Sequence, residues 1–233
     1  ELPLPAFDLI RRLDYVPIVT STGCPYRCEY CASRFLNPRF ITKDPHQVLD
    51  GILHWHRERG VRDFAFYDDA LLVDFATHLG PILEALVKHD LGLRFHTPNA
   101  LHVRELSAEA ADLLWRAGFK TIRRGFETSD MTLHQCLDRK LSEGDFERAV
   151  HSLLKAGFSK EHIGAYILAG LPGQSVRSVK DTAEFVNKAG AMPYLAEYSP
   201  IPHTPLWDKA VACSRYDLVS EPLFHNNTLL PCW

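Results

Sequence analysis

Runs of apolar residues alternate with amphipathic stretches along most of the chain. Short apolar runs separated by helical periods are typical of repeated βα units around a parallel sheet. We expect strands at 15–21, 63–67, 92–97, 121–126, 164–169 and 194–199. Helical patterns lie between them, at 45–59, 74–89, 108–117, 145–156 and 176–188.

Glycines follow four of these helical patterns, at Gly60, Gly118, Gly157 and Gly190. A residue in the left-handed conformation commonly ends a helix, and glycine adopts it most easily. Ser107 is placed to cap the start of the third helix. The predicted βα units are fewer than the eight that close a barrel. The predicted fold is therefore α/β, a partial (β/α)6 barrel of the TIM type with an open parallel sheet.

The length of 233 residues, with 46% apolar residues, suits one globular domain with its own core. We divide it into a lead-in or linker at 1–14, a barrel at 15–200 and a C-terminal extension of the barrel at 201–233. The chain begins with Glu1, and its last residues follow neither a terminal helix nor a polar tail. We therefore expect it to be a piece of a longer protein.

The net charge of −3 is spread along the sequence without a basic block. This distribution argues against a nucleic-acid partner. The sequence contains no apolar run of 18 residues and no secretory signal at its N-terminus, so we expect no membrane partner and a cytoplasmic location.

Three of the six cysteines, Cys24, Cys28 and Cys31, lie directly after the first predicted strand with the spacing C-x3-C-x2-C. Three thiolates suit an iron–sulfur cubane and leave its fourth iron without a protein ligand. A zinc site or redox-active thiols are the alternatives, but zinc needs a fourth ligand at short spacing, and His46 is far along the chain. The other cysteines, Cys136, Cys213 and Cys232, are widely spaced, and we expect them to be small buried residues.

With Tyr30 before the last cysteine, this loop resembles the CxxxCxΦC signature of the radical S-adenosylmethionine (radical SAM) superfamily. The resemblance implies a [4Fe-4S] cluster on Cys24, Cys28 and Cys31, with S-adenosylmethionine (SAM) as second cofactor. It further implies reductive cleavage of SAM to a 5′-deoxyadenosyl radical that abstracts hydrogen from a small-molecule or peptide substrate. An electron donor such as flavodoxin or ferredoxin is an expected partner.

The same resemblance assigns residues at later strand ends to SAM. Asp68 and Asp69 correspond to the position that binds the methionine amino group, although an acidic pair can also form a turn or a helix cap. Asn99 could bind ligand or shape an Asx turn. The segment with Ile167, Gly170 and Pro172 is similar to the one that lines the adenine, or it is an ordinary strand-to-helix turn.

Arg123 and Glu127 fall on one face of a regular strand, because side chains alternate. There they could meet the carboxylate and the ribose of SAM, and Glu127 is at a SAM-contacting position by resemblance. A bulge would bring in Arg124 instead of Arg123. The alternative is an ion pair between Arg123 and Glu127 inside the barrel.

Several segments, at 4–8, 66–72, 97–102, 197–207 and 224–228, together resemble radical SAM proteins with an N-terminal cobalamin-binding domain. His203 replaces a glycine expected in that pattern. The cobalamin domain would precede Glu1, and no D-x-H-x-x-G segment occurs here, so cobalamin is possible only through a domain not in this chain. The alternatives to simple hydrogen abstraction are a cobalamin-dependent radical SAM methyltransferase and a non-catalytic iron–sulfur electron carrier.

Overall fold

Parallel strands with short helical crossovers determine the architecture of the computed structural model, which describes residues 5–233. The strands are β1 (Tyr15–Ile18), β2 (Ser21–Thr22), β3 (Ile41–Thr42), β4 (Asp63–Phe66), β5 (Arg94–His102), β6 (Phe119–Glu127), β7 (Ile163–Ala169) and β8 (Met192–Glu197). The α-helices are α1 (Ser33–Leu36), α2 (Pro45–Arg59), α3 (Leu79–His89), α4 (Ala108–Ala117), α5 (Met131–Leu137), α6 (Asp145–Ala156), α7 (Val176–Lys188) and α8 (Trp207–Cys213). Short 3-10 turns lie at Phe7–Leu9, Val103–Glu105, Lys160–His162, Pro222–His225 and Asn227–Leu229.

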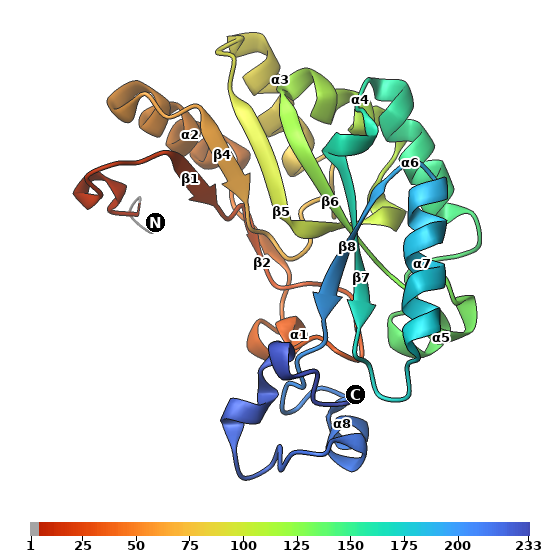
Figure 1. Cartoon of the computed structure of the whole chain (residues 1–233). Helices are drawn as coiled ribbons and strands as arrows, with labels where there is room; N and C mark the ends of the chain where they lie inside the picture. Colours follow the sequence, from red (N-terminus) through yellow and green to blue (C-terminus); the bar gives the residue numbers. More distant parts are fainter. Residues whose placement is uncertain (1–4) are drawn as a thin grey trace.

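Six strands form one parallel sheet in the order β1-β4-β5-β6-β7-β8. The sheet is open, because β1 and β8 are its two edges. All strands run in the same direction, so their carboxyl ends meet at the lower edge in Figure 1. The predicted partial barrel is thus confirmed. A separate antiparallel pair, β2 with β3, lies within the connection from β1 to α2.

The core lies between the sheet and the helices that follow its strands. Phe64, Phe66, Phe95 and Phe119 are at most 1% exposed, and they pack ring against ring under the helices. Alternation along the strands sends the neighbouring residues to the opposite, inner face of the sheet. That face exposes tyrosines such as Tyr194.

Helices α2, α4, α6 and α7 have the predicted bounds. Ser107 caps α4 by accepting a hydrogen bond from the Ala110 N–H, and Gly60, Gly118 and Gly157 have left-handed backbone at the ends of their helices. The prediction for α3 was wrong, because it begins at Leu79 rather than at residue 74. Asp74 has a φ of 55°, which is incompatible with a right-handed helix, and turns occupy the residues up to His78.

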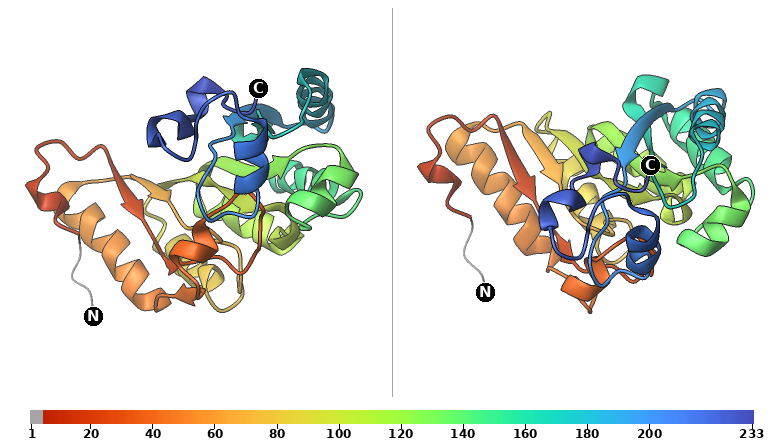
Figure 2. Two further views of the ribbon diagram at one scale, coloured as in Figure 1. Left: turned by 90° about the horizontal axis from the view of Figure 1, so that it is seen from below. Right: turned by 60° about the horizontal axis from the view of Figure 1, so that its bottom comes forward.

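The residues after β8 lie across the carboxyl end of the sheet, as the view from below in Figure 2 shows. They form a second apolar cluster, in which Leu206, Leu218 and Cys232 pack with Leu137 of α5 and Leu171 after β7. Helices α5 and α8 were not predicted from the sequence. The boundaries of the predicted lead-in, barrel and extension stay predictions, and residues 1–4 of the lead-in lie outside the described residues.

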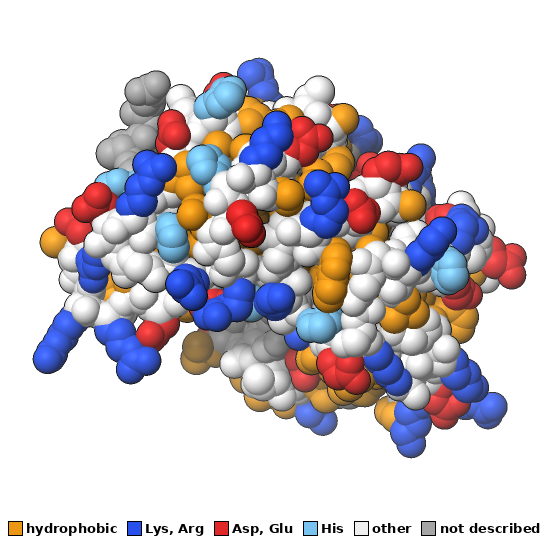
Figure 3. All heavy atoms as spheres, turned by 90° about the horizontal axis from the view of Figure 1, so that it is seen from above, with side chains coloured by type: hydrophobic (Ala, Val, Ile, Leu, Met, Phe, Trp, Pro, Cys, Tyr) orange, Lys and Arg blue, Asp and Glu red, His pale blue; other side chains and the backbone are white. Residues whose placement is uncertain are grey.

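On the opposite end of the sheet, basic and acidic side chains are interspersed over the surface (Figure 3). None of the helices in residues 5–233 has the length and apolar character that crossing a membrane requires.

Candidate functional site: a cysteine loop beside buried charges

The cysteine loop leaves the sheet at the carboxyl end of β1 and returns through β3. Gly23 allows the start of the loop to pass close to the backbone of Arg39, because a Cβ at this position would lie 2.2 Å from the Arg39 carbonyl oxygen. The loop is further attached to distant parts of the chain. The Glu29 N–H donates to the Leu137 carbonyl (2.7 Å), and the Glu29 carbonyl accepts from the Leu206 N–H (3.0 Å). The loop is therefore fixed by α5 on one side and by the C-terminal extension on the other.

The three thiols of the loop are free, and they differ in burial. Cys28 is buried, whereas Cys24 and Cys31 are half-buried. Burial raises the pKa of the Cys24 thiol, and it raises that of Cys28 to about 11. The Ser33 N–H points at the Cys31 sulfur over 3.4 Å. Thiolates at these positions need compensating positive charge, which a bound iron–sulfur cluster and nearby donors would supply.

Lys140 places a positive charge beside the cysteine loop. It is 9% exposed, and its ammonium interacts electrostatically with Cys28 and Glu127. Burial disfavours its ammonium, but the charges of Glu127 and Cys28 outweigh burial and raise the pKa of Lys140. The ammonium also lies 5.7 Å from the Tyr26 ring centroid and 6.0 Å from that of Tyr30. Lys140 therefore remains charged beside the cysteine loop.

Glu127 ends β6 and meets the loop directly. The Tyr30 hydroxyl donates a hydrogen bond of 2.6 Å to its Oε1, so two residues predicted at the site are in contact. The φ of Glu127 is 62°, and the pairing of β6 with β7 shifts register between Gly125 and Glu127. Its other oxygen, Oε2, is buried without a hydrogen-bond partner. A buried carboxylate oxygen without a donor is costly, and a ligand hydroxyl would satisfy it.

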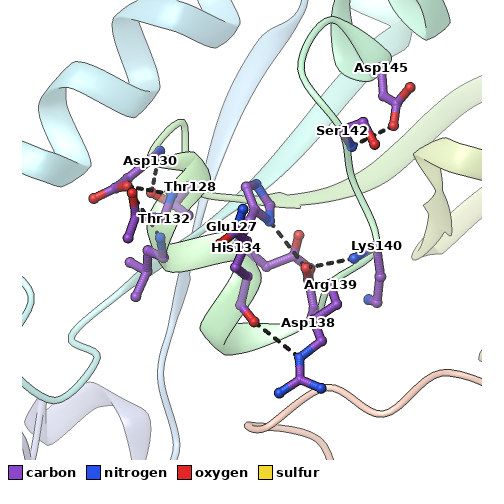
Figure 4. Close-up of polar contacts among 12 residues, drawn as sticks. Glu127, Thr128, Asp130, Thr132, His134, Asp138, Arg139, Lys140, Ser142 and Asp145 are labelled. Atoms are coloured by element: carbon purple, nitrogen blue, oxygen red, sulfur yellow. Dashed lines mark hydrogen bonds and ion pairs between the residues drawn. The ribbon is translucent and has the colours of Figure 1, made fainter.

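His134 and Asp138 of the α5 region complete the buried polar group (Figure 4). Their Nδ1 and Oδ1 atoms are 3.2 Å apart, and both residues are shielded from solvent. Burial lowers the pKa of His134, but the hydrogen bond and charge of Asp138 outweigh burial and raise it. His134 Nε2 and Asp138 Oδ2 are buried without partners, like Glu127 Oε2. Ligand atoms of the three residues lie within 4.8 Å of one another, which gathers unsatisfied polar atoms beside the cysteines.

His102 closes the site on the β5 side. Its Nε2 lies 3.6 Å from the Cys24 sulfur, and its ring packs against Tyr26 with a centroid distance of 4.2 Å. Burial first, and then the charge of Lys140, lowers the pKa of His102 to about 3. The imidazole is therefore neutral at physiological pH, and it adds no charge to the site.

A search of protein-family models matches the Radical SAM superfamily over residues 18–186, which is more than half of the chain. The chain belongs to the radical SAM superfamily. The cofactors of this family are a [4Fe-4S] cluster and SAM, and the residues present fit them. Three free thiols share one loop, a buried cation lies against one of them, and orphaned polar atoms lie beside it.

Curated relatives of this radical SAM domain carry methyltransferase names. An uncharacterized methyltransferase, PH0819, of Pyrococcus horikoshii is 24% identical over 221 residues, covering 91% of this chain and 47% of that protein. A hopanoid C-2 methylase of Rhodopseudomonas palustris is 27% identical over 222 residues, covering 89% of this chain and 40% of that protein. The chain thus spans less than half the length of these relatives.

Among solved structures, the fold is similar to the radical SAM methyltransferase TsrM from Kitasatospora setae, solved with tryptophan and a SAM analogue. The TM-score is 0.72 at 21% identity, and the match covers 88% of this chain and 40% of that one. At this identity the likeness supports the fold.

Four other residues predicted to contact SAM lie in the carboxyl-terminal half of their strand or directly after it, in different settings. Asn99 donates to the Tyr67 carbonyl over 2.8 Å, so its side chain links β5 to the end of β4. The Ile167 side chain is fully buried in the helix-covered core, and its backbone is paired with β6 on one side and β8 on the other. Gly170 has a φ of 90°, and the Gln174 side chain accepts from its N–H over 3.0 Å. Pro172 is half-buried in the same turn.

The structure does not bring Arg123 to Glu127. The Arg123 guanidinium stacks over the Tyr194 ring on the inner face, 4.3 Å from its centroid, and forms no ion pair within residues 5–233. The register shift comes after Arg123, so Arg124 does not replace it: Arg124 is fully buried on the helix side, over the Phe146 ring. Neither the predicted shared position nor the alternative ion pair of Arg123 and Glu127 is formed.

The remaining cysteines correct another expectation. Cys136 and Cys213 are exposed, and only Cys232 of the three is buried. His203 has a φ of 67°, the conformation that the expected glycine would favour, and its ring stacks on Phe35 with centroids 4.9 Å apart. Sequence reasoning missed Lys140 and His134, because an isolated lysine and histidine between helical patterns give no signal of burial.

Proposed function

We propose that this radical SAM domain cleaves SAM reductively and directs the resulting radical to a small-molecule or peptide substrate. When bound, the [4Fe-4S] cluster supplies the electron for this cleavage. The carrying observation is the group of three free thiols beside the buried Lys140 and Glu127. We assign Cys24, Cys28 and Cys31 as the iron ligands.

The protein side chains would bind and orient SAM around that centre. The Lys140 ammonium can meet the SAM carboxylate, since it is a buried cation over the Tyr26 and Tyr30 rings of the cysteine loop and can donate charge-assisted hydrogen bonds. The free Oε2 of Glu127 can accept a hydrogen bond from a ribose hydroxyl. The backbone around Ile167, Gly170 and Pro172 remains our proposal for the adenine. Burial of these groups excludes water that would quench a radical.

The test is anaerobic reconstitution followed by dithionite and SAM. We expect 5′-deoxyadenosine and methionine in equal amounts, and neither product from Cys28→Ala. Wild-type protein with a verified cluster and no turnover would contradict the proposal. A cluster whose spectrum ignores added SAM would instead favour an iron–sulfur electron carrier.

A cobalamin-dependent methyltransferase is the second candidate, and the methyltransferase names of the relatives favour it. Cobalamin would be bound by a domain outside these 233 residues. Full-length protein carrying methylcobalamin, with S-adenosylhomocysteine among its products, would support this candidate. Flavodoxin or ferredoxin as electron donor, a cytoplasmic location, and the lack of nucleic-acid and membrane partners are further parts of the proposal.

A further inference from the structure

The neighbouring aspartates after β4 are held in very different ways. Asp68 is 3% exposed, and its Oδ1 accepts from the backbone N–H groups of Thr20 (2.9 Å) and Ser21 (2.5 Å). The hydroxyls of Thr20 and Ser21 donate to the same oxygen, each over 2.7 Å. Asp69 is half-buried, and within residues 5–233 its carboxylate forms no hydrogen bond. The Oδ1 atom of Asp68 is thus held by the protein, whereas its buried Oδ2 has no hydrogen-bond partner. The Asp69 carboxylate is available as a whole.

A histidine extends the network of Asp68. The Thr20 hydroxyl donates its one hydrogen bond to Asp68. The Thr20 oxygen therefore accepts a hydrogen bond from His78 Nε2, which lies 2.8 Å away. His78 is 1% exposed and belongs to the turns before α3. One hydrogen-bonded chain therefore connects the start of α3, the end of β1 and the end of β4.

This network holds the point where the chain leaves the sheet for the cysteine loop. β1 ends at Ile18, and Cys24 follows Thr20 by four residues. The Thr20 carbonyl also accepts from the Lys43 N–H (2.8 Å). The start of the cysteine loop is therefore joined to the segment in which the loop ends, after β3. Hydrogen bonds to a buried carboxylate are stronger than neutral ones, and their loss leaves donors unsatisfied.

We propose that Asp68 and His78 are positioning residues that fix the cysteine loop, so that Asp69 is the member of the pair left for the SAM ammonium that the family resemblance places here. The division of roles rests on the proposed function. Asp69 directly follows Asp68 after the carboxyl end of β4, beside the point where the chain leaves β1 for the cysteine loop.

The decisive experiment compares SAM with its analogue lacking the α-amino group, using anaerobically reconstituted protein and equilibrium binding per cluster. Asp68→Asn should weaken both ligands alike, by about tenfold, because it disturbs the loop rather than one ligand contact. Asp69→Asn should weaken SAM by about tenfold and the analogue by less than about twofold. The control is Asp74→Asn, an exposed aspartate in the next turn, which should change neither.

Iron retention tests the positioning role independently of SAM. After reconstitution and desalting, Asp68→Asn and His78→Phe should hold about threefold less iron than Asp74→Asn, and the electron paramagnetic resonance spectrum of the reduced cluster should broaden. Ser21→Ala removes one of the four donors and should have a smaller effect of the same kind.

Two results would overturn the inference. Loss of affinity for SAM but not for the analogue in Asp68→Asn would make Asp68 a direct ligand. Wild-type iron content and spectrum in both Asp68→Asn and His78→Phe would also refute the positioning role. Failure of wild-type protein with an intact cluster to cleave SAM would refute the proposed function instead, while the iron measurements would still decide the role of Asp68.

Discussion

Charged side chains are exposed and paired at one end of the parallel sheet, and buried and partly unpaired at the other. At the amino end, Asp63 is paired with Arg94 and lies 3.3 Å from His96, and all three side chains are partly exposed. At the carboxyl end, Glu127, Asp138 and Lys140 are at most 9% exposed. Several carboxylate oxygens there have no hydrogen-bond partner.

Burial of unsatisfied charge costs stability, so a protein tolerates it where function requires it. The amino end satisfies its charges within the protein and with water. The carboxyl end leaves polar atoms that ligands can satisfy, in agreement with the position of active sites in parallel α/β folds. The contrast therefore separates residues that stabilise the domain from those that serve its chemistry.

Loss of a cysteine at the carboxyl end should have the largest effect. Cys28→Ala removes the buried thiol of the loop and should reduce SAM cleavage below detection, because three protein ligands are needed to hold the cluster. Iron content and 5′-deoxyadenosine formation measure this effect. Cys136→Ala, at an exposed cysteine of α5, is the matched control and should retain both. Equal loss in the two variants would mean that the site has been misplaced.

The layer between the two ends should determine stability rather than chemistry. Phe95 is fully buried between Phe66 and Phe119, with centroid distances of 5.7 and 5.4 Å. Phe95→Ala should lower the free energy of unfolding by about 3–5 kcal/mol, measured by urea denaturation. The exposed Phe35 offers the same substitution as a control, with an expected loss below about 0.5 kcal/mol. A comparable loss at both positions would contradict the assignment of the core.

The sequence predicts the regular helices of the domain better than it predicts the site at the carboxyl end of the sheet. The bounds of α2 and α4 could be predicted because apolar periodicity, Ser107 and the terminal glycines all agree. The acidic pair at Asp68 and Asp69 indicated a site, but two adjacent identical side chains give no signal of which one is buried. Only the packing of the β1 exit against β4 separates their roles.

The carboxyl end is less predictable because its partners are distant in sequence. Tyr30 and Glu127 are 97 residues apart, and Lys140 comes from an irregular segment after α5. Helix α5 has only seven residues, too few for its periodicity to be recognised. The buried charge of Lys140 depends on this tertiary arrangement.

Replacing the buried cation should have a smaller effect than either loss above. Lys140→Met retains most of the side-chain volume but removes the charge beside Cys28 and Glu127. We expect SAM to bind about tenfold more weakly, or ~1.4 kcal/mol, because the carboxylate would lose its ion pair. Equilibrium binding to cluster-loaded protein measures this change. Lys120→Met, at an exposed position of β6, should bind SAM like the wild type. Unchanged affinity in Lys140→Met would assign the SAM carboxylate to another residue.

The ion pair at the amino end should matter least, and its pH dependence has a definite sign. The hydrogen bond from Arg94 lowers the pKa of Asp63 below its usual value. The stabilisation is therefore fully present above the unfolded-state pKa near 4, and it disappears as the pH falls through the lower folded-state pKa. Because the pair is partly exposed, Asp63→Asn should cost only about 0.5–1 kcal/mol at pH 7 and nearly nothing at pH 2. Denaturation at the two pH values measures the difference, and a loss of the same size at both would mean that Asp63 stabilises the fold by packing rather than by its charge.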